Sequence, residues 1–214
     1  VPRETAAVSL GAHDVANKIS ELPDVNVVRN GSRGATWLEP LVEVEVNEQR
    51  IAYGPVTKDD VDSLFESGFL NGGSHPLKLG PTEEIPFLSK QERWTFVRCG
   101  IIDPLSVDDY TTHQGFDGLK IALDKGPKYV IEEVLASGLR GRGGAGFPTG
   151  IKWKTVADTE NAQKYITCNA DEGDSGTFSD RILMESDPMS LIEGMMIAGY
   201  AVGANKGYIY LSSE

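Results

Sequence analysis

The residue types best suited to ligand chemistry gather in one glycine-rich window, residues 138–150. Six glycines fall within these thirteen positions: Gly138, Gly141, Gly143, Gly144, Gly146 and Gly150. Residues 134–157 contain no acidic residue and four basic ones, Arg140, Arg142, Lys152 and Lys154. Glycine lets backbone N–H groups approach an anion closely, and nearby cations neutralise its charge. The window therefore predicts a loop that binds an anionic ligand; the alternative is an exposed flexible loop with cations gathered by chance.

This loop does not fit the two common phosphate-binding patterns. Residues 141–146 match G-x-G-x-x-G, but the dinucleotide fingerprint follows a strand and opens a helix. Here residues 130–137 have helical spacing, and we expect Phe147-Pro148 to break any helix that follows. A Walker loop is excluded because the sequence contains no Gly-Lys-Ser/Thr. We therefore expect the ligand to be held by a different geometry.

A second polar window follows a predicted buried strand at residues 164–168. It carries an amide and three carboxylates: Asn169, Asp171, Glu172 and Asp174. Open α/β sheets bind ligands at the carboxyl ends of their strands, so these groups suit ribityl or ribose hydroxyls, or ring nitrogens. A metal site is disfavoured because no histidine accompanies the carboxylates. The alternative is a polar turn whose Asp and Ser side chains cap the next element.

The elements that position both windows form a βαβ pattern in the second half of the chain. Upstream, residues 96–100 read as a strand, followed by short helices near 108–111 and at 116–123. We then predict helices at 128–137 and from Asp187-Pro188 to about residue 202, and strands at 164–168 and 207–211. A strand, a long helix and a strand predict a parallel pair with a right-handed crossover.

The first half predicts a smaller α/β unit. Its expected elements are a helix at 6–19, a strand at 25–29, a hairpin at 41–46 and 50–53 turned by Asn47-Glu48, and a helix from Thr57 to Gly68 with Asp60 completing a capping box. The order helix, three strands, helix favours a thioredoxin-like layer.

These patterns predict two domains. We expect the first at residues 1–70, a linker at 71–92 that is rich in glycine and proline, and the second at 93–214. The second domain stops just where its sheet needs further strands. We therefore expect it to be incomplete, with the chain truncated at its C-terminus.

Composition excludes several classes of protein. Acids outnumber bases 32 to 20, and the net charge of −12 disfavours a nucleic-acid binder. The longest apolar stretch, residues 189–204, is interrupted by Glu193 and is too short to span a membrane. Cys99 and Cys168 cannot hold an iron–sulfur cluster between them, since such clusters take four thiolates. A reduced, cytoplasmic protein without a metal site in this segment is expected.

Two long motifs now resemble a known family. Residues 137–153 (SGLRGRGGAGFPTGIKW) and 168–172 (CNADE) are similar to the paired signature of the flavin-bearing, NADH-oxidising subunit of respiratory complex I. The same subunit type occurs in NAD-reducing hydrogenases and in soluble NAD-dependent formate dehydrogenases. Residues 176–181 (GTFSDR), 193–195 (EGM) and 207–210 (GYIY) continue the resemblance, which covers 93–214. It implies an α/β fold in which a Rossmann-like FMN- and NADH-binding domain follows the N-terminal domain.

The N-terminal part resembles the thioredoxin-like extension of the hydrogenase and formate-dehydrogenase branch. In cluster-binding relatives, residues 31–36 would read Gly-Cys-x-Gly-x-Cys. Here Ser32 and Thr36 occupy the cysteine positions, so this extension lacks the ligands of a [2Fe–2S] cluster. This variant is most similar to the beta (diaphorase) subunit of formate dehydrogenase.

The resemblance also implies roles for single residues. Those that would wrap FMN are Gly141, Arg142, Gly143, Gly144 and Gly146. Lys152 and Asn169 would hydrogen-bond the flavin, Asp171 and Glu172 would complete its pocket, and Phe147 would stack on the NADH adenine. Asp174 would face the ribose and select NAD over NADP. Thr155 departs from the pattern, because some relatives have a second stacking aromatic there.

The implied function is FMN-dependent electron transfer between NAD(H) and iron–sulfur clusters. The resemblance places a [4Fe–4S] cluster beyond Glu214. It also implies two partners, a thioredoxin-like [2Fe–2S] subunit and a cluster-bearing catalytic subunit. The alternatives are the same module in a hydrogenase or in complex I, and a non-catalytic scaffold that keeps the fold for subunit contacts.

Overall fold

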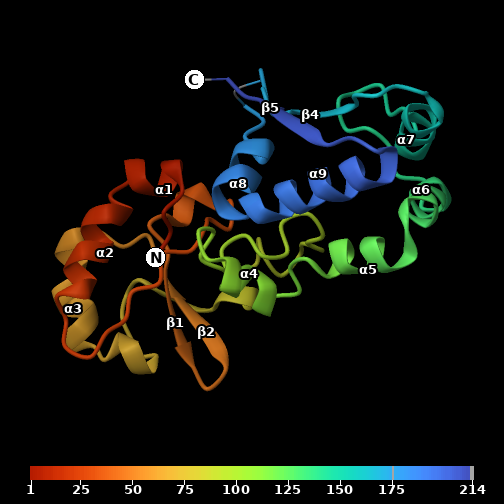
Figure 1. Ribbon diagram of the computed structural model, residues 1–214. Helices are drawn as coiled ribbons and strands as arrows, with labels where there is room; N and C mark the ends of the chain where they lie inside the picture. The colour runs from red at the N-terminus through yellow and green to blue at the C-terminus, as the bar shows by residue number, and fades with distance from the viewer. Residues whose placement is uncertain (175, 213–214) are drawn as a thin grey trace. The chain divides into compact units, whose positions relative to one another are not determined.

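The computed structural model describes residues 1–174 and 176–212, which form two compact units (Figure 1). Unit 1 comprises Val1–Asp109 and Ile182–Asp187, and unit 2 comprises Tyr110–Arg181 and Pro188–Glu214. Each unit combines helices with a small sheet. The α/β class is therefore confirmed, and the two units are described one at a time.

The sheet of unit 1 is antiparallel, in the order β1 (Val42–Val46), β2 (Gln49–Tyr53) and β3 (Lys78–Pro81). The predicted hairpin is correct: Val46 pairs with Gln49, and Asn47 and Glu48 turn the chain at φ 51° and 62°. Positive φ at both central residues is the geometry that matches strand twist in a two-residue turn. β3 lies inside the segment that we expected to be a linker.

The first helices of unit 1 differ from the expected single helix at 6–19. The structure has α1 (Thr5–Ser9) and α2 (Ala12–Ser20), separated at Gly11, whose φ of +101° no helix accommodates. The expected strand at 25–29 is also wrong. That segment makes two backbone bonds to the chain start, Val1 N to Val28 O at 3.1 Å and Arg3 N to Asn30 O at 2.9 Å. The predicted order of helix, three strands and helix is therefore not formed.

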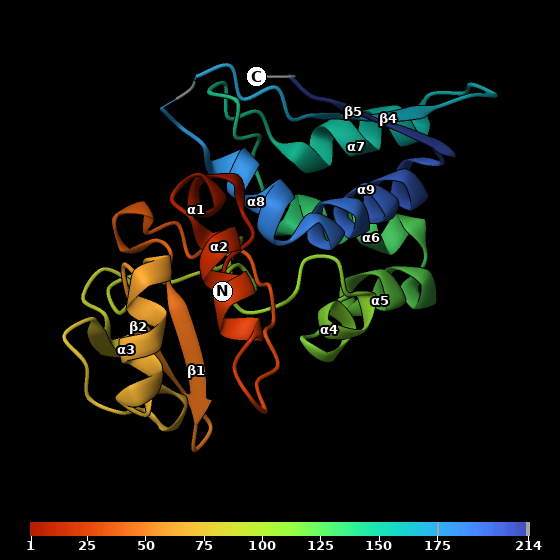
Figure 2. The same ribbon diagram turned by 90° about the vertical axis from the view of Figure 1, so that its left-hand side faces the viewer.

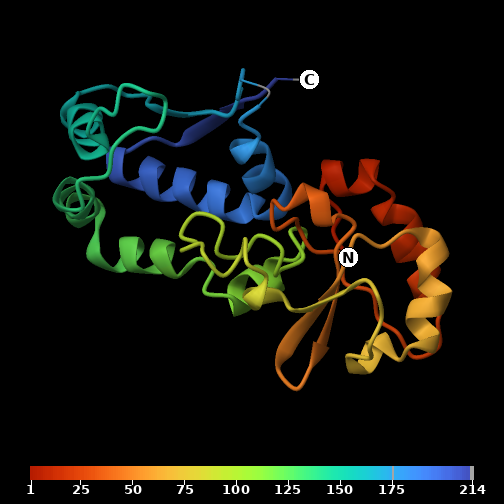
Figure 3. The same cartoon turned by 180° about the vertical axis from the view of Figure 1, so that it is seen from behind.

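The next helix of unit 1 follows its predicted signals. Thr57 and Asp60 form the capping box at the start of a short 3₁₀ turn (Lys58–Asp60), which leads into α3 (Val61–Glu66). Gly68 follows at φ 72°. Apolar side chains of α2, α3 and the hairpin form one core, made of Val15, Ile19, Val42, Ile51, Tyr53, Val56, Val61, Leu64 and Phe69. Figure 3 shows α2 and α3 on one side of the β1–β2 hairpin, and Figure 2 views the unit from that side.

Three further 3₁₀ turns complete the first half of the chain, at Thr36–Leu38, Phe69–Asn71 and Thr82–Glu84. The expected strand at 96–100 is replaced by turns. Gly100 lies there at φ +83°, and a Cβ added to it would come within 2.6 Å of the Arg33 side chain. The backbone at Gly100 is therefore not extended, and only a residue without a side chain leaves room for Arg33 there.

The helices of the second half are α4 (Val107–Thr112), α5 (Asp117–Lys125), α6 (Pro127–Ala136), α7 (Thr149–Asp158), α8 (Ser179–Ser186) and α9 (Pro188–Val202). Its strands, β4 (Tyr165–Asn169) and β5 (Lys206–Tyr210), pair in parallel, from Tyr165 opposite Lys206 to Asn169 opposite Tyr210. The predicted βαβ unit with α9 as its crossover is confirmed. α9 lies along the strands and also contacts α5, α6 and α7 (Figure 1).

Candidate functional site

The glycine loop, residues 140–148, is closed at its base and open at its tip. Gly141 N donates to Phe147 O at 2.9 Å, and Thr149 N donates to Leu139 O at 2.8 Å. The Arg140 guanidinium crosses the loop to the Gly146 carbonyl at 2.9 Å. These bonds fix the two ends of the loop, so that residues 142–146 project from a stable base.

The tip of this loop offers backbone donors and room beside them. Within the described ranges, no protein group accepts a hydrogen bond from the N–H groups of residues 142–146. A Cβ added to Gly143, Gly144 or Gly146 would meet no atom within 4 Å. Unbonded N–H groups in an uncrowded loop tip can donate to a phosphate or to the edge of a planar ring. The geometry of the loop is therefore compatible with an anionic cofactor.

The helix after the loop corrects one expectation and supplies a cation. α7 begins at Thr149, directly after Pro148, so the proline starts this helix instead of breaking it. Gly150 allows α7 to pack closely against α6, because an added Cβ would lie 2.7 Å from the Leu135 backbone. Lys152, in the first turns of α7, places its Nζ 5.7 Å from the centroid of the Phe147 ring, which is 47% exposed. An exposed ring and an ammonium group thus flank the glycine loop.

The second polar window forms a turn at the carboxyl end of β4. Asn169 is the last residue of that strand, and its Oδ1 accepts from Asp171 N at 3.2 Å. Asp174 Oδ1 accepts from Gly176 N at 3.1 Å. Both are local turns of the kind that short amide and carboxylate side chains make with the backbone. The parallel pairing puts Asn169 beside Tyr210, at the sheet edge where such folds bind ligands.

Glu172 caps the helix that follows the turn. The sequence analysis gave helix capping only as the alternative interpretation of this polar window. Its carboxylate accepts hydrogen bonds at the start of α8, from Ser179 Oγ at 3.1 Å, Asp180 N at 2.8 Å and Arg181 N at 2.9 Å. Burial alone would raise the pKa of Glu172, but these bonds outweigh it and lower the pKa. The pKa of Asp180 is raised by burial and by the neighbouring Glu172 charge. The signal in the sequence was an acidic residue seven positions before Ser179.

The predicted site residues thus fall into two groups. The loop and α7 bring together Gly141, Arg142, Gly143, Gly144, Gly146, Phe147 and Lys152, and the turn brings together Asn169, Asp171, Glu172 and Asp174. Among residues 1–174 and 176–212, no hydrogen bond or ion pair joins the two groups. Their roles toward a ligand stay predictions.

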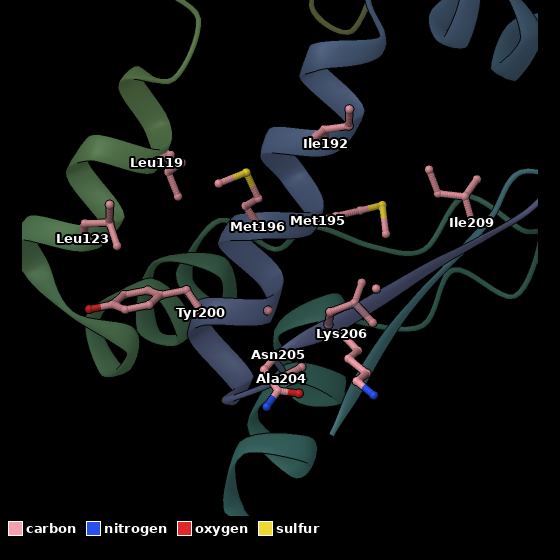
Figure 4. Close-up of a pocket in the computed structure, with 13 residues that line it drawn as sticks. Leu119, Leu123, Ile192, Met195, Met196, Tyr200, Ala204, Asn205, Lys206 and Ile209 are labelled. Carbon is pink, nitrogen blue, oxygen red and sulfur yellow. The ribbon is translucent and has the colours of Figure 1, made fainter. Parts of the chain in front are cut away.

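Sequence reasoning missed an apolar cavity of about 570 Å³ in unit 2. Leu119 and Leu123 of α5, Met195 and Met196 of α9 and Ile209 of β5 face it (Figure 4). None of the predicted site residues lines it. The apolar cavity and the predicted polar site therefore share no residues.

Two other features bear on the site. Cys99 and Cys168 are free thiols, and burial raises the pKa of Cys99 to about 12 and that of Cys168 above its usual value. The part of the chain that the structure describes contains no group of three or more His, Cys, Asp or Glu side chains arranged for a metal ion. None of its helices is long and apolar enough to cross a lipid bilayer.

Comparison with known proteins covers both polar windows. A family model described as the Nuo51 FMN-binding domain matches residues 134–214. The NADP-reducing hydrogenase subunit HndC of Solidesulfovibrio fructosivorans is 51% identical over 125 residues, 58% of this chain and 25% of that protein. A subunit of the NADH-quinone oxidoreductase of Aquifex aeolicus is 50% identical over 109 residues, 51% of this chain and 25% of that protein. The corresponding subunit of the Streptomyces coelicolor enzyme is 42% identical over 142 residues, 66% of this chain and 29% of that protein.

This chain thus spans about a quarter of the length of the curated relatives that it matches. The match still includes the whole glycine loop, the turn after β4 and the βαβ unit that carries them. Residues 134–214 of this chain are thus similar to the Nuo51 FMN-binding domain and to the corresponding segments of these relatives.

Proposed function

We propose that the glycine loop and the turn after β4 form one wall of an FMN- and NAD(H)-binding site in an NADH dehydrogenase (diaphorase) module. The observation that carries the proposal is the set of free N–H groups at residues 142–146, inside the segment that matches an FMN-binding family. FMN and NAD(H) supply hydride and single-electron transfer when bound. The work of the protein is then to bind, orient and shield them.

The glycine loop has the chemistry to hold the anionic part of FMN. Its backbone N–H groups can donate to phosphate oxygens, and Arg142 adds an exposed guanidinium from the same loop. Lys152 brings a second cation from α7. Gly141, Gly143, Gly144 and Gly146 leave the ligand room that side chains would fill.

The turn after β4 has the chemistry to orient the rest of the ligand. Asn169 offers amide groups to the flavin, and Asp171 and Glu172 complete this wall. The Phe147 ring is exposed enough for an adenine to stack on it. The Asp174 carboxylate is exposed and repels a 2′-phosphate, which favours NAD over NADP. The relatives named above include an NADP-reducing enzyme, so this preference needs a direct measurement.

An FMN titration of the full-length protein tests the proposal. We expect flavin fluorescence to be quenched on binding, and ferricyanide to be reduced by NADH once FMN is bound. Lys152→Ala should weaken FMN binding about tenfold, the size of one lost charge-assisted hydrogen bond. Lys154→Ala is the matched control, because Lys154 lies on the same helix with its ammonium bonded to Asp158 at 2.5 Å. Absence of flavin binding would contradict the proposal and favour a non-catalytic scaffold.

We further propose which multi-subunit enzyme contains this module. The serine and threonine at positions 32 and 36 of a thioredoxin-like extension favour the diaphorase subunit of a cytoplasmic NAD-dependent formate dehydrogenase. Its partners would be a thioredoxin-like [2Fe–2S] subunit and a cluster-bearing catalytic subunit, with a [4Fe–4S] cluster in a part of the family that this chain does not cover. The alternatives are a hydrogenase and complex I. Purifying the native complex and measuring NAD⁺ reduction with formate and with hydrogen separates the first two.

A further inference from the structure

Glu172 stands out in the turn after β4 because both of its carboxylate oxygens accept hydrogen bonds from protein groups. One oxygen accepts from Ser179 Oγ at 3.1 Å and from Asp180 N at 2.8 Å, and the other accepts from Arg181 N at 2.9 Å. The first N–H groups of a helix have no partner within the helix, and an anion placed there is favoured by the helix dipole. Glu172 therefore caps α8 from seven residues upstream.

The backbone of Glu172 is also unusual. Its φ is +44°, in the left-handed region that residues other than glycine rarely adopt. Such a conformation persists when surrounding contacts hold it in place. The three bonds to the start of α8 are the contacts that hold this one.

Asp171 provides an internal contrast. It is the preceding residue, carries the same charge and lies close to Glu172 in the same turn. No donor in the described ranges reaches its carboxylate, and only its backbone N–H is bonded, to Asn169 Oδ1 at 3.2 Å. One of the two adjacent carboxylates is thus engaged by the protein, and the other is available to a ligand.

We propose that Glu172 is a positioning residue, which ties the turn at 169–174 to the start of α8 and acts on the ligand through that turn. This inference rests on the proposed function, because it assigns Asp171 and Asn169, and not the Glu172 carboxylate, to direct contact with FMN. The tie is made by a carboxylate and three donors of the same chain, so it is present before the ligand binds.

Amide hydrogen exchange in the full-length protein without FMN tests the tie directly. Glu172→Ala should speed the exchange of the Asp180 and Arg181 amides about tenfold, the size of one charge-assisted hydrogen bond. Glu172→Gln keeps one acceptor oxygen and turns an NH₂ group toward the other donor, so one of the two amides should stay protected. Asp171→Asn is the matched control and should leave both amides at their wild-type rates. Unchanged exchange in Glu172→Ala would overturn the inference.

FMN binding gives the second readout. We expect Glu172→Ala to weaken FMN about tenfold while the visible absorption spectrum of the bound flavin stays that of the wild type, because no group beside the ring has changed. A shifted spectrum in Glu172→Gln with both α8 amides still protected would overturn the inference and make Glu172 a direct ligand. A wild-type protein that binds no FMN would contradict the proposed function, and the exchange rates would still decide whether Glu172 holds the turn.

Discussion

Two loops of similar composition use their polar groups in opposite ways. In residues 31–36 (GSRGAT) of unit 1 the chain is buried through most of the loop, with Ser32 2% exposed and Arg33 3% exposed, and only Thr36 at its end is exposed. Ser32 N donates to Ser186 Oγ at 3.0 Å, and Ser32 Oγ donates to Glu39 at 2.8 Å. In residues 141–146 (GRGGAG) of unit 2, Arg142 is exposed and the N–H groups at 142–146 have no acceptor among the described residues.

The difference shows that composition alone does not decide between a structural and a binding loop. Buried polar groups usually have a hydrogen-bond partner, and in residues 31–36 the protein itself provides partners for the Ser32 N–H and hydroxyl, the Gly34 N–H and both Nη atoms of Arg33. In residues 141–146 the partner must be water or a ligand. We therefore expect the first loop to be structural and the second to bind a ligand, a distinction that variants of each loop can test.

The largest effect is expected from removing the charge of Arg33. Its guanidinium pairs with Glu43 at 2.9 Å and with Glu83 at 2.7 Å, and the Glu43 side chain is 5% exposed. Burial alone would lower the pKa of Arg33, but the two carboxylates raise it, so the residue is charged. Arg33→Ala leaves Glu43 buried without its cation, and we expect the free energy of unfolding to fall by about 3–5 kcal/mol.

Lys154→Ala is the comparison variant in unit 2. Its ion pair with Asp158 is more than half exposed on both sides, so its loss should change stability by at most about 1 kcal/mol. Urea denaturation of both variants measures the contrast. Equal losses would show that Arg33 is not a buried structural cation.

Glu39 should make unit 1 sensitive to pH. Burial raises its pKa from 4.5 to about 7, against the hydrogen bonds from Leu41 N and Ser32 Oγ and with help from Glu4 and Glu43. An acid whose folded pKa is raised stabilises the fold fully below pH 4.5 and loses that contribution as the pH rises to about 7. The loss should be roughly 3 kcal/mol.

Glu39→Gln removes the titration and keeps one acceptor oxygen for Leu41 N. The stability of this variant relative to the wild type should therefore increase between pH 4.5 and 7 and stay constant above that range. Urea unfolding of both proteins at four pH values measures the difference. A difference that does not change with pH would show that Glu39 is solvated in the folded protein.

Local signals predicted much of this fold. α6, α9, β4, β5 and the β1–β2 hairpin each follow from a periodic pattern with a clear turn or cap at its end. The errors arose where a contact with a distant residue, or the dihedral angle of a single residue, determines the local secondary structure. Gly11 separates α1 from α2 by adopting φ +101°, and Gly100 lies against Arg33, 67 positions away. Neither effect has a periodic signature.

The sequence identified the residues of the candidate site better than it identified what each of them does in the structure. The glycine loop was recognisable because it concentrates glycines and cations without acids. The capping role of Glu172 was not recognisable, because it depends on the start of α8, seven to nine residues later, lying next to the turn. Nor did the sequence show that Pro148 would start α7, since proline is compatible with both the end and the beginning of a helix.

The same substitution in the two loops should have different consequences. Gly31→Ala places a Cβ 2.2 Å from Ser186 Cβ and 2.6 Å from Ser186 Cα, and we expect it to destabilise the protein by about 1–3 kcal/mol. A Cβ added to Gly143 meets nothing within 4 Å, so Gly143→Ala should change stability by less than about 0.5 kcal/mol.

For ligand binding the order should reverse. The added methyl group at residue 143 takes up part of the open space at the loop tip, so FMN should bind about tenfold more weakly, the size of one lost charge-assisted hydrogen bond. Thermal melts and FMN titrations of both variants provide the two measurements. A destabilised Gly143→Ala with normal FMN affinity would remove the distinction between the loops.

The smallest effect is expected at the edge of the ligand-binding region, at Asp174. Its Oδ1 accepts from Gly176 N at 3.1 Å, and asparagine retains that acceptor, so Asp174→Asn removes the charge and keeps the turn. If the carboxylate repels the 2′-phosphate of NADP, the NADH to NADPH ratio of kcat/KM should fall about fivefold, which corresponds to about 1 kcal/mol for a charge in contact with solvent. Asp158→Asn is the control, because that carboxylate is also exposed and bonds Lys154 at the end of α7. A ratio that is unchanged in Asp174→Asn, or that falls equally in both variants, would place Asp174 away from the ribose and restrict the ligand-binding region to the glycine loop and the start of the turn.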